Sequence, residues 1–302
     1  MKCSRCGNKA VVELRYVGEA LCPKHFSELF EKRIKRVIAG SKMLDRKKDK
    51  IAVGVSGGKD SLVLLYLLKK MHYEIIAVTI DEGIRGYRDK SLSYIKKFCR
   101  DHGISWKVYS LKKECGFTLD QIAKKGRVCS YCGVLRRGLL NKKARELGCT
   151  KVATGHNLDD EAQMILMNLF RGELERLARS GPVSGLIEDE LFVPRVKPLR
   201  ECPEREDVLY AILHKIEYTD VECPYARYAY RNVVRDLLNN MEERYPGTKF
   251  AILKNFDKML PFLREYYMPA EKPKRCKKCG EITRGQVCKF CSVVEDFGFK
   301  RK

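Results

Sequence analysis

Residues 51–61 read I-A-V-G-V-S-G-G-K-D-S, and this stretch decides the fold. Its apolar first half predicts a short buried strand, and the apolar run Leu62–Leu68 behind it predicts a helix. Glycines between a strand and a helix let backbone N–H groups approach phosphate oxygens, and the helix dipole adds to that attraction. The spacing differs from the G-x-x-x-x-G-K-[ST] loop, and Asp60 beside phosphate favours a bridging magnesium ion. The stretch therefore predicts a magnesium–nucleotide loop, the alternative being a glycine turn that only joins the two elements.

Strand-like and helix-like segments alternate on both sides of this loop. Short apolar runs are followed by longer segments whose apolar residues recur at helical spacing. This alternation predicts β-α-β units, and hence a parallel sheet with helices on both faces, which is the α/β class. The predicted strands are Ile51–Val55, Ile75–Ile80, Trp106–Tyr109 and Val152–Thr154, and the predicted helices are Phe26–Ile38, Leu62–Leu68, Leu92–Cys99, Asp159–Phe170 and three near 204–216, 229–244 and 248–264.

Composition divides the chain into four parts. Cysteine-bearing modules occupy residues 1–26 and 268–302, and the second begins with a linker rich in proline and lysine, Met268–Lys274. Between them we expect a nucleotide-binding α/β domain over residues 27–200, with its preceding helix. A helical extension over residues 201–267 is expected to complete that domain.

The net charge points to a polyanionic partner. The 302 residues include 61 Lys and Arg against 39 Asp and Glu, which gives a formal charge of +22. A solvated lysine-rich surface, as heat-adapted proteins carry, explains many of these charges but not the excess of one sign. Nucleic acid is the commonest polyanion that such an excess attracts. No apolar run approaches the roughly 18 residues of a membrane helix, and no signal-peptide pattern follows Met1. We therefore expect a cytoplasmic protein without membrane contact.

The cysteines of the two terminal modules have the spacing of zinc ligands. In each module two C-x-x-C or C-x-x-H pairs are separated by a short loop, and thiolate and imidazole suit tetrahedral Zn²⁺. Modules this small cannot bury a core, so the metal would supply their folding energy. Four protein ligands leave no open position, so we expect the zinc ions to be structural and not catalytic. The predicted ligands are Cys3, Cys6, Cys22 and His25 for the first zinc, and Cys276, Cys279, Cys288 and Cys291 for the second.

Two further motifs lie between the modules. Cys129 and Cys132 form a C-x-x-C pair directly before a predicted basic helix, which carries Arg136 and Arg137. Such a pair is redox-active, half of a zinc site or part of an iron–sulfur site. Residues 155–163, G-H-N-L-D-D-E-A-Q, follow the predicted strand at 152–154. They therefore belong to the same carboxyl edge of the sheet as the glycine loop, where open α/β sheets bind ligands. The alternative is that the acids at 159 and 160 only stabilise the helix dipole from its first turn and have no catalytic role.

Together these motifs resemble one family. S-G-G-K-D-S after I-A-V-G-V resembles the PP-loop of the ATP pyrophosphatase superfamily, whose members adenylate a substrate oxygen and release pyrophosphate. With C-S-Y-C-G, G-H-N-L-D-D-E-A-Q and the later Cys223 in E-C-P-Y, the chain resembles the TtcA/TtuA family of tRNA 2-thiolation enzymes over essentially its whole length. The resemblance implies an adenine nucleotide alpha hydrolase-like fold between two zinc modules. It also implies that the enzyme is an ATP-dependent tRNA sulfurtransferase that forms AMP and pyrophosphate.

The resemblance also assigns residues. It implies that Cys129, Cys132 and Cys223 hold a [4Fe-4S] cluster with one open iron that accepts sulfide. A zinc site or a catalytic persulfide cysteine remains the alternative there. Lys59, Asp60 and Asp160 are implied as catalytic residues, with Asp60 placing Mg²⁺. Arg136 and Arg137 are candidates for contacting ATP or tRNA phosphate, against a merely solvated helix. The implied ATP-binding residues are Val55, Ser56, Gly57, Gly58, Lys59, Asp60, Ser61, Ile80, Gly155 and Asp160.

The expected reaction is adenylation of the uridine C2 oxygen followed by displacement of AMP by sulfur. The favoured target is the uridine of the thymine loop, partly because that modification belongs to heat-adapted organisms, and the alternative is the wobble uridine of the anticodon. The family further implies sulfide or a thiocarboxylated ubiquitin-like protein as sulfur donor, and a homodimer. A different PP-loop adenylating ligase would have no use for the three cysteines, and an RNA-binding protein with a relic nucleotide fold would not turn over ATP.

Overall fold

The computed structural model describes residues 1–123, 128–184, 189–226, 230–267 and 274–297. A mixed sheet with the strand order β5-β4-β3-β6-β8-β7 forms its centre. The strands β3 (Lys50–Gly54), β4 (Glu74–Asp81), β5 (Trp106–Ser110), β6 (Lys151–Thr154) and β8 (Arg195–Val196) are parallel, and only β7 (Val183–Ser184) is antiparallel to its neighbour. The predicted α/β class with a parallel sheet is therefore confirmed.

Alternation along β3 separates two cores. Ile51 and Val53 face a core that contains the helices α1 (Pro23–Gly40), α2 (Lys59–Lys70) and α9 (Glu204–Leu213). Ala52 faces the opposite core, under α6 (Val128–Glu146) and α12 (Lys289–Asp296). A strand that is buried on both faces has a continuous apolar sequence. The apolar run at residues 51–55 predicted this strand for that reason.

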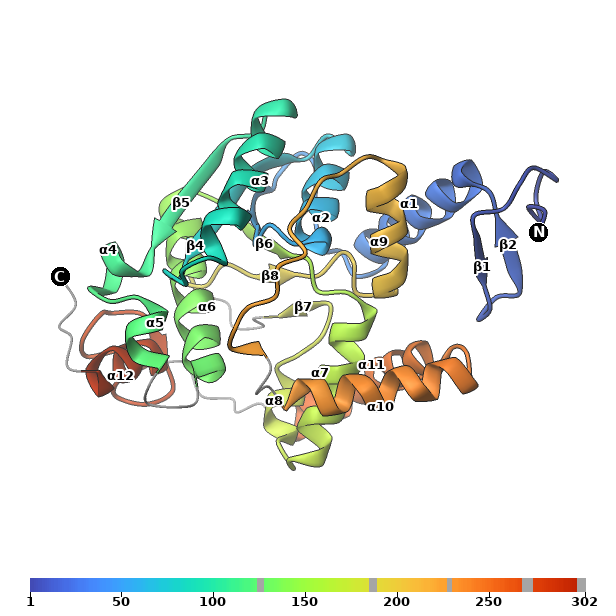
Figure 1. Cartoon of the computed structure of the whole chain (residues 1–302). Coiled ribbons are helices and arrows are strands. Elements are labelled where there is room, and N and C mark those ends of the chain that lie inside the picture. Colours follow the sequence, from blue (N-terminus) through green and yellow to red (C-terminus); the bar gives the residue numbers. More distant parts are fainter. Residues whose placement is uncertain (124–127, 185–188, 227–229, 268–273, 298–302) are drawn as a thin grey trace.

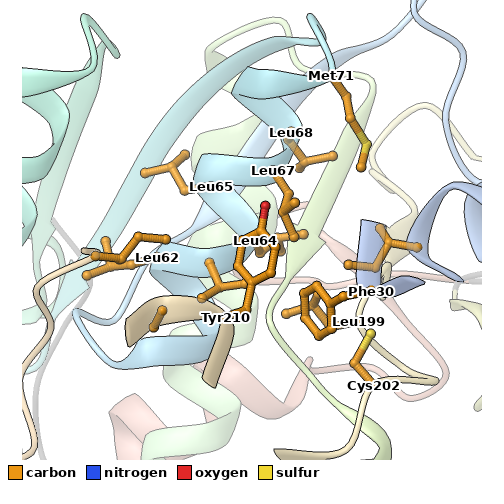
Figure 2. Packing of buried hydrophobic residues seen from close by; sticks show 14 of the residues in the cluster. Phe30, Leu62, Leu64, Leu65, Leu67, Leu68, Met71, Leu199, Cys202 and Tyr210 are labelled. Atoms are coloured by element: carbon orange, nitrogen blue, oxygen red, sulfur yellow. The ribbon is translucent and has the colours of Figure 1, made fainter. Parts of the chain in front are cut away.

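The first core is closed by aromatic side chains on elements that are distant in sequence. Tyr210 of α9 is fully buried and stacks on Phe30 of α1, with 4.7 Å between ring centroids. Figure 2 shows both rings beside Leu64 of α2, with Leu199 and Cys202 nearby. The N-terminal helix and the helical region after residue 200 are thereby joined to the sheet through one apolar cluster.

The remaining elements surround this frame (Figure 1). The predicted helices near 229–244 and 248–264 are α10 and α11, and the two terminal modules contain short hairpins that the sequence did not indicate. The predicted linker at 268–274 and the boundary at 268 lie almost entirely outside the described residues, and the division at residues 26, 200 and 267 stays a prediction. The bounds are β1 Val12–Leu14, β2 Glu19–Leu21, α3 Arg88–Asp101, α4 Leu111–Cys115, α5 Leu119–Ile122, α7 Leu158–Phe170, α8 Leu174–Ala178, α10 Arg231–Arg244, α11 Thr248–Tyr267, β9 Lys274–Arg275 and β10 Ile282–Thr283.

The terminal modules lie at opposite ends of the molecule (Figure 1). The β1–β2 hairpin leads into α1, whereas α12 packs on α6 at the other end. Within the described ranges, no helix has both the length and the apolar character that crossing a membrane requires.

Candidate active site and metal sites

The glycine loop between β3 and α2 has a backbone that other residues would not adopt. Gly57 has a φ of +91°, and a Cβ there would lie 3.0 Å from the Cβ of Ser91. The Ser61 hydroxyl accepts a hydrogen bond from the Ser56 amide at 3.2 Å and donates one to the Gly58 carbonyl at 2.9 Å. Gly58 is the N-cap of α2 and supplies no side chain to the free amides of the first turn. The loop therefore presents backbone donors at a helix N-terminus, the arrangement that binds phosphate.

Asp60 follows the loop and has an oxygen without a partner. Its Oδ1 is buried and makes no hydrogen bond within the described structure, while Oδ2 lies 3.5 Å from Lys59 Nζ. Burial raises the pKa of Asp60 to about 6, and the negative charge of Asp160 adds to that effect. An orphaned carboxylate oxygen beside a second carboxylate is a donor set that Mg²⁺ fits, because a hard cation neutralises both acids.

The G-H-N-L-D-D-E-A-Q motif lies against the glycine loop, as expected from the shared edge of the sheet. A Cβ at Gly155 would lie 2.8 Å from the backbone carbon of Asp60, so only glycine permits this approach. Asn157 caps α7 through a reciprocal pair of hydrogen bonds with Asp160, 3.0 and 3.3 Å long. The cap fixes Asp160 in the first turn, where Arg231 of α10 contacts its Oδ1 at 2.5 Å.

A cavity of about 570 Å³ opens between these segments. Of the residues implied to bind ATP, Gly57, Gly58 and Lys59 lie outside its lining, and the ammonium of Lys59 points to Glu204 at 2.6 Å. The others all line it: Val55, Ser56, Asp60, Ser61, Ile80, Gly155 and Asp160. The cavity is large enough for a nucleotide and collects polar groups from the ends of several strands.

The walls of this cavity are strongly basic. Burial lowers the pKa of Arg195 to about 10, and the nearby Arg137 adds to that effect. Desolvation lowers the pKa of His156 well below its usual range, and the positive charges of Lys197 and Arg195 lower it further. The cationic lining residues are Arg88, Arg136, Arg137, Arg179, Arg195, Lys197 and Arg231. Such a surface is complementary to a triphosphate and to an RNA backbone.

The C-x-x-C pair lies inside a helix. We predicted that it comes before the basic helix, and this is wrong, because α6 already begins at Val128. The i, i+3 spacing therefore puts both thiols on one helix face. Burial raises the pKa of Cys132 to about 11, and the charge of Cys223 acts on both helix thiols. The Cys129 thiol also lies 3.6 Å from the backbone carbonyl of Tyr225, two residues after Cys223.

The three cysteines form a different kind of site from the terminal modules. Among the described residues, only the two terminal sets have all their ligand atoms within 4.8 Å of one another, as a single ion requires. Cys129, Cys132 and Cys223 are not one of these tight sets, and three thiols of which two share a helix face are a donor set that an iron–sulfur cluster accepts. Gly133 and Arg136, the neighbours of Cys132 on α6, line the basic cavity.

Each terminal module brings its four predicted ligands together. In the first, the Cys3 thiol lies 3.4 Å from His25 Nδ1, and the Cys6 and Cys22 thiols are 3.8 Å apart. In the second, the Cys279 and Cys288 thiols are 3.6 Å apart, with Cys276 and Cys291 completing the set. Soft ligands at these separations and in this number fit tetrahedral Zn²⁺.

Sequence reasoning missed Glu82, which connects the two halves of the site. Its side chain is 1% exposed and is paired with Arg88 and, at 3.0 Å, with Arg136 Nε. Arg88 also donates to the Ser56 carbonyl at 3.0 Å. Glu82 directly follows β4, so the carboxyl-edge rule that singled out residues 155–163 applies to it as well.

Arg195, Lys197 and Arg231 were missed too. The first two belong to or follow the two-residue strand β8, and Arg231 begins α10. None of them lies in a motif, and no sequence signal identifies them.

A glycine loop at the carboxyl edge of a parallel sheet, with two acids and basic walls, defines a PP-loop nucleotide-binding protein. The PP-loop domain model matches residues 26–242, and the model of the 2-thiouridine synthetase TtuA N-terminal LIM domain matches residues 2–27. The chain is 40% identical to a tRNA-5-methyluridine(54) 2-sulfurtransferase of Pyrococcus horikoshii, over all of this chain and 95% of that one. It is 38% identical to the tRNA 2-thiolation protein NcsA of Haloferax volcanii, with 98% of each covered. The chain therefore belongs to the TtuA/NcsA family of tRNA 2-thiolation proteins.

A solved structure of the same family has the same fold throughout. The U34-tRNA thiolase NcsA of Methanococcus maripaludis, determined with its [4Fe-4S] cluster, superposes with a TM-score of 0.86 at 34% identity. The match covers all of this chain and 98% of that one. The predicted membership of the tRNA 2-thiolation family is thus confirmed.

Proposed function

We propose that this chain uses ATP to replace the C2 oxygen of a tRNA uridine by sulfur. The observation that supports this most is one basic cavity bounded by the PP-loop, by the acids at 60 and 160, and by the helix that carries Cys129 and Cys132. A uridine bound in this cavity would therefore lie close both to the nucleotide and to a sulfur held by the cysteines. An ATP-dependent ligase without sulfur chemistry has no need of the cysteine helix.

The first step is adenylation. The uridine C2 oxygen attacks the α-phosphorus, the bond to the bridging oxygen breaks, and pyrophosphate leaves. Backbone amides at residues 57, 58 and 61 hold the phosphates, and the acids Asp60 and Asp160 hold Mg²⁺ against them. Arg88, Arg136 and Arg195 are further sources of positive charge for the developing phosphate charge. Lys59, held by Glu204, acts at this step through its charge beside Asp60.

The second step replaces AMP by sulfur. A [4Fe-4S] cluster on Cys129, Cys132 and Cys223 would supply a sulfide on its open iron, shielded from bulk water. The chain's own contribution is to hold that position beside Arg136, whose positive charge acts on the Cys132 thiol and which lines the cavity. Sulfur attacks C2 of the adenylated uridine, the C–O bond breaks, and the oxygen leaves with AMP.

The target base has two candidates. The first is the thymine-loop uridine, supported by the 40% identical relative that is named for position 54. The second is the wobble uridine, supported by the solved relative that is named for position 34. One experiment separates them: protein reconstituted anaerobically with iron and sulfide is incubated with unmodified tRNA, Mg-ATP and sulfide, and RNase fragments are examined by mass spectrometry. Sulfur in the thymine-loop fragment supports the first, and sulfur in the anticodon fragment supports the second. No sulfur in any fragment, with cluster and ATP bound, contradicts thiolation with this donor.

The remaining expectations are proposals of the same kind. Homodimerisation is supported by exposed apolar side chains on α10 and α11, of which Val233, Phe262 and Tyr266 are more than two-thirds exposed. Sulfide or a thiocarboxylated ubiquitin-like protein remains the proposed donor. A reducing cytoplasm is supported by the two sets of clustered cysteines, because thiols bind metal only when they are reduced.

A further inference from the structure

A second large groove lies at the opposite edge of the sheet from the active-site cavity. Its volume is about 1220 Å³, and it is formed by the end of α1, the loop 41–49, the turn after α2 and the first residue of β6. Both β3 and β6 begin at this edge and end at the cavity. The five residues of β3 span about 13 Å at ~3.3 Å per residue, so the groove and the cavity lie at the two ends of the same short strand.

Most charged side chains of this groove are cations without partners. Lys70 is paired with Glu31 at 2.6 Å, and no other cation of the lining forms an ion pair within the described structure. These six unpaired cations are Lys35, Lys42, Arg46, Lys47, Lys48 and Lys151. All but Lys151 are exposed, so they are available to a ligand at little cost in desolvation.

The acids of the groove are occupied by the protein itself. Glu31 accepts hydrogen bonds from Lys70 and from the Tyr210 hydroxyl, the latter at 2.8 Å. Asp49 accepts from the Thr150 hydroxyl and from the Asp45 amide, both at 2.7 Å. The acids therefore hold the surrounding chain in place, and the unpaired charge that faces solvent is positive.

The basic run 46–48 is a fixed turn. The Asp45 carboxylate accepts from the Lys47 amide at 2.8 Å, and the Asp49 amide donates to the Asp45 carbonyl at 2.9 Å. Met43 is fully buried beneath this turn and anchors it to the apolar core. The three cations are thus presented in one orientation, which reduces the entropy lost when a ligand orders them.

An RNA backbone is the ligand that these features fit. Exposed Lys and Arg side chains make the phosphate contacts of nucleic-acid complexes, whereas a small anion requires buried, convergent donors. Tyr73, half-buried, and His72, exposed, add ring surfaces beside the cations. We propose that this groove binds the sugar-phosphate backbone of the tRNA at a distance from the base being modified. The inference rests on the proposed function, because it takes tRNA as the substrate.

The test compares two double variants of equal charge. Lys47→Ala/Lys48→Ala removes two groove cations, and Lys112→Ala/Lys113→Ala removes two exposed lysines of α4, away from the groove. The dissociation constant for unmodified tRNA is measured from 50 to 200 mM salt by fluorescence anisotropy. The slope of log affinity against log salt concentration falls by about 0.9 for each lost phosphate contact. If the groove variant loses two contacts, raising the salt from 50 to 200 mM should weaken its binding about tenfold less than it weakens wild-type binding. ATP affinity and the rate at saturating tRNA stay unchanged.

Each outcome bears on a different statement. A reduced slope in the groove variant alone supports the groove. Wild-type binding of tRNA with the same slope in both variants overturns the groove and leaves the proposed function intact. A wild-type chain that does not bind tRNA at any of these salt concentrations contradicts the proposed function. The affinity for a polyglutamate peptide is measured in the same way. If the groove variant loses as much affinity for this peptide as it loses for tRNA, the groove binds anions in general, and the assignment to RNA is overturned.

Discussion

Replacing Glu82 by glutamine should weaken both the fold and the nucleotide site. The carboxylate is almost fully buried and neutralises Arg88, which is 2% exposed, as well as Arg136. Removing one partner of a buried ion pair leaves the other charge uncompensated and costs about 3–5 kcal/mol. Glutamine keeps the shape and one acceptor oxygen, so we expect a loss near 3 kcal/mol in the free energy of unfolding.

The second effect follows from the Arg88 bond to the Ser56 carbonyl. Without Glu82, Arg88 no longer holds the PP-loop in one position, and the KM for ATP should rise together with a fall in kcat. Denaturant titration followed by circular dichroism gives the first quantity, and pyrophosphate release gives the second.

The matched control is Glu217→Gln, which makes the same chemical change. Glu217 forms a salt bridge with Lys97 at 2.7 Å, with both side chains more than half exposed. An exposed pair contributes at most about 1 kcal/mol, so this variant should unfold like the wild type. If Glu82→Gln shifts neither the unfolding midpoint nor the KM beyond this control, the coupling through Glu82 is refuted.

Three other predictions address the metals and the cavity. Cys129→Ala, Cys132→Ala and Cys223→Ala should each abolish thiolation while ATP affinity stays unchanged, and full iron content with activity in any of them would remove that residue from the cluster. Cys22→Ala should reduce the zinc content from two equivalents to one and melt the N-terminal hairpin, because Cys22 is buried with Leu14 and Leu21 of that hairpin; a variant that keeps both zinc ions would contradict the ligand set. The folded-state pKa of His156 is depressed, so the folded chain binds fewer protons than the unfolded chain and loses stability as the pH falls below about 6.5. His156→Gln should flatten that loss between pH 7.5 and 5.5 in denaturant titrations, and an unchanged pH dependence would show that the imidazole is protonated in the cavity.

The fold was largely predictable because its centre is built from local signals. The apolar run at 51–55 and the glycine loop identify a buried strand and its helix, and the structure moves each of their bounds by only a few residues. The meeting of Gly155 with Asp60 also followed from the sequence, since parallel strands end at one edge.

The unpredicted parts depend on tertiary contacts. Arg195 reaches the cavity from a strand of only two residues, which is too short for any periodicity. Lys59 is directed to Glu204, 145 positions away, and this contact arises only when α9 packs on α2. The start of α6 at Val128 was missed because glycine and cysteine are poor indicators of a helix.

The packing of α12 on α6 has a consequence for synthesis of the chain. Gly138 of α6 faces Phe290, and a Cβ at position 138 would lie 2.7 Å from the ring. The two helices can therefore approach this closely only because residue 138 has no side chain. Val293 and Val294 are buried in the same cluster as Leu135 and Leu139. Domains fold from the N-terminus as the ribosome delivers them. The helix that carries Cys129 and Cys132 thus lacks its apolar cover until the last of these residues has emerged.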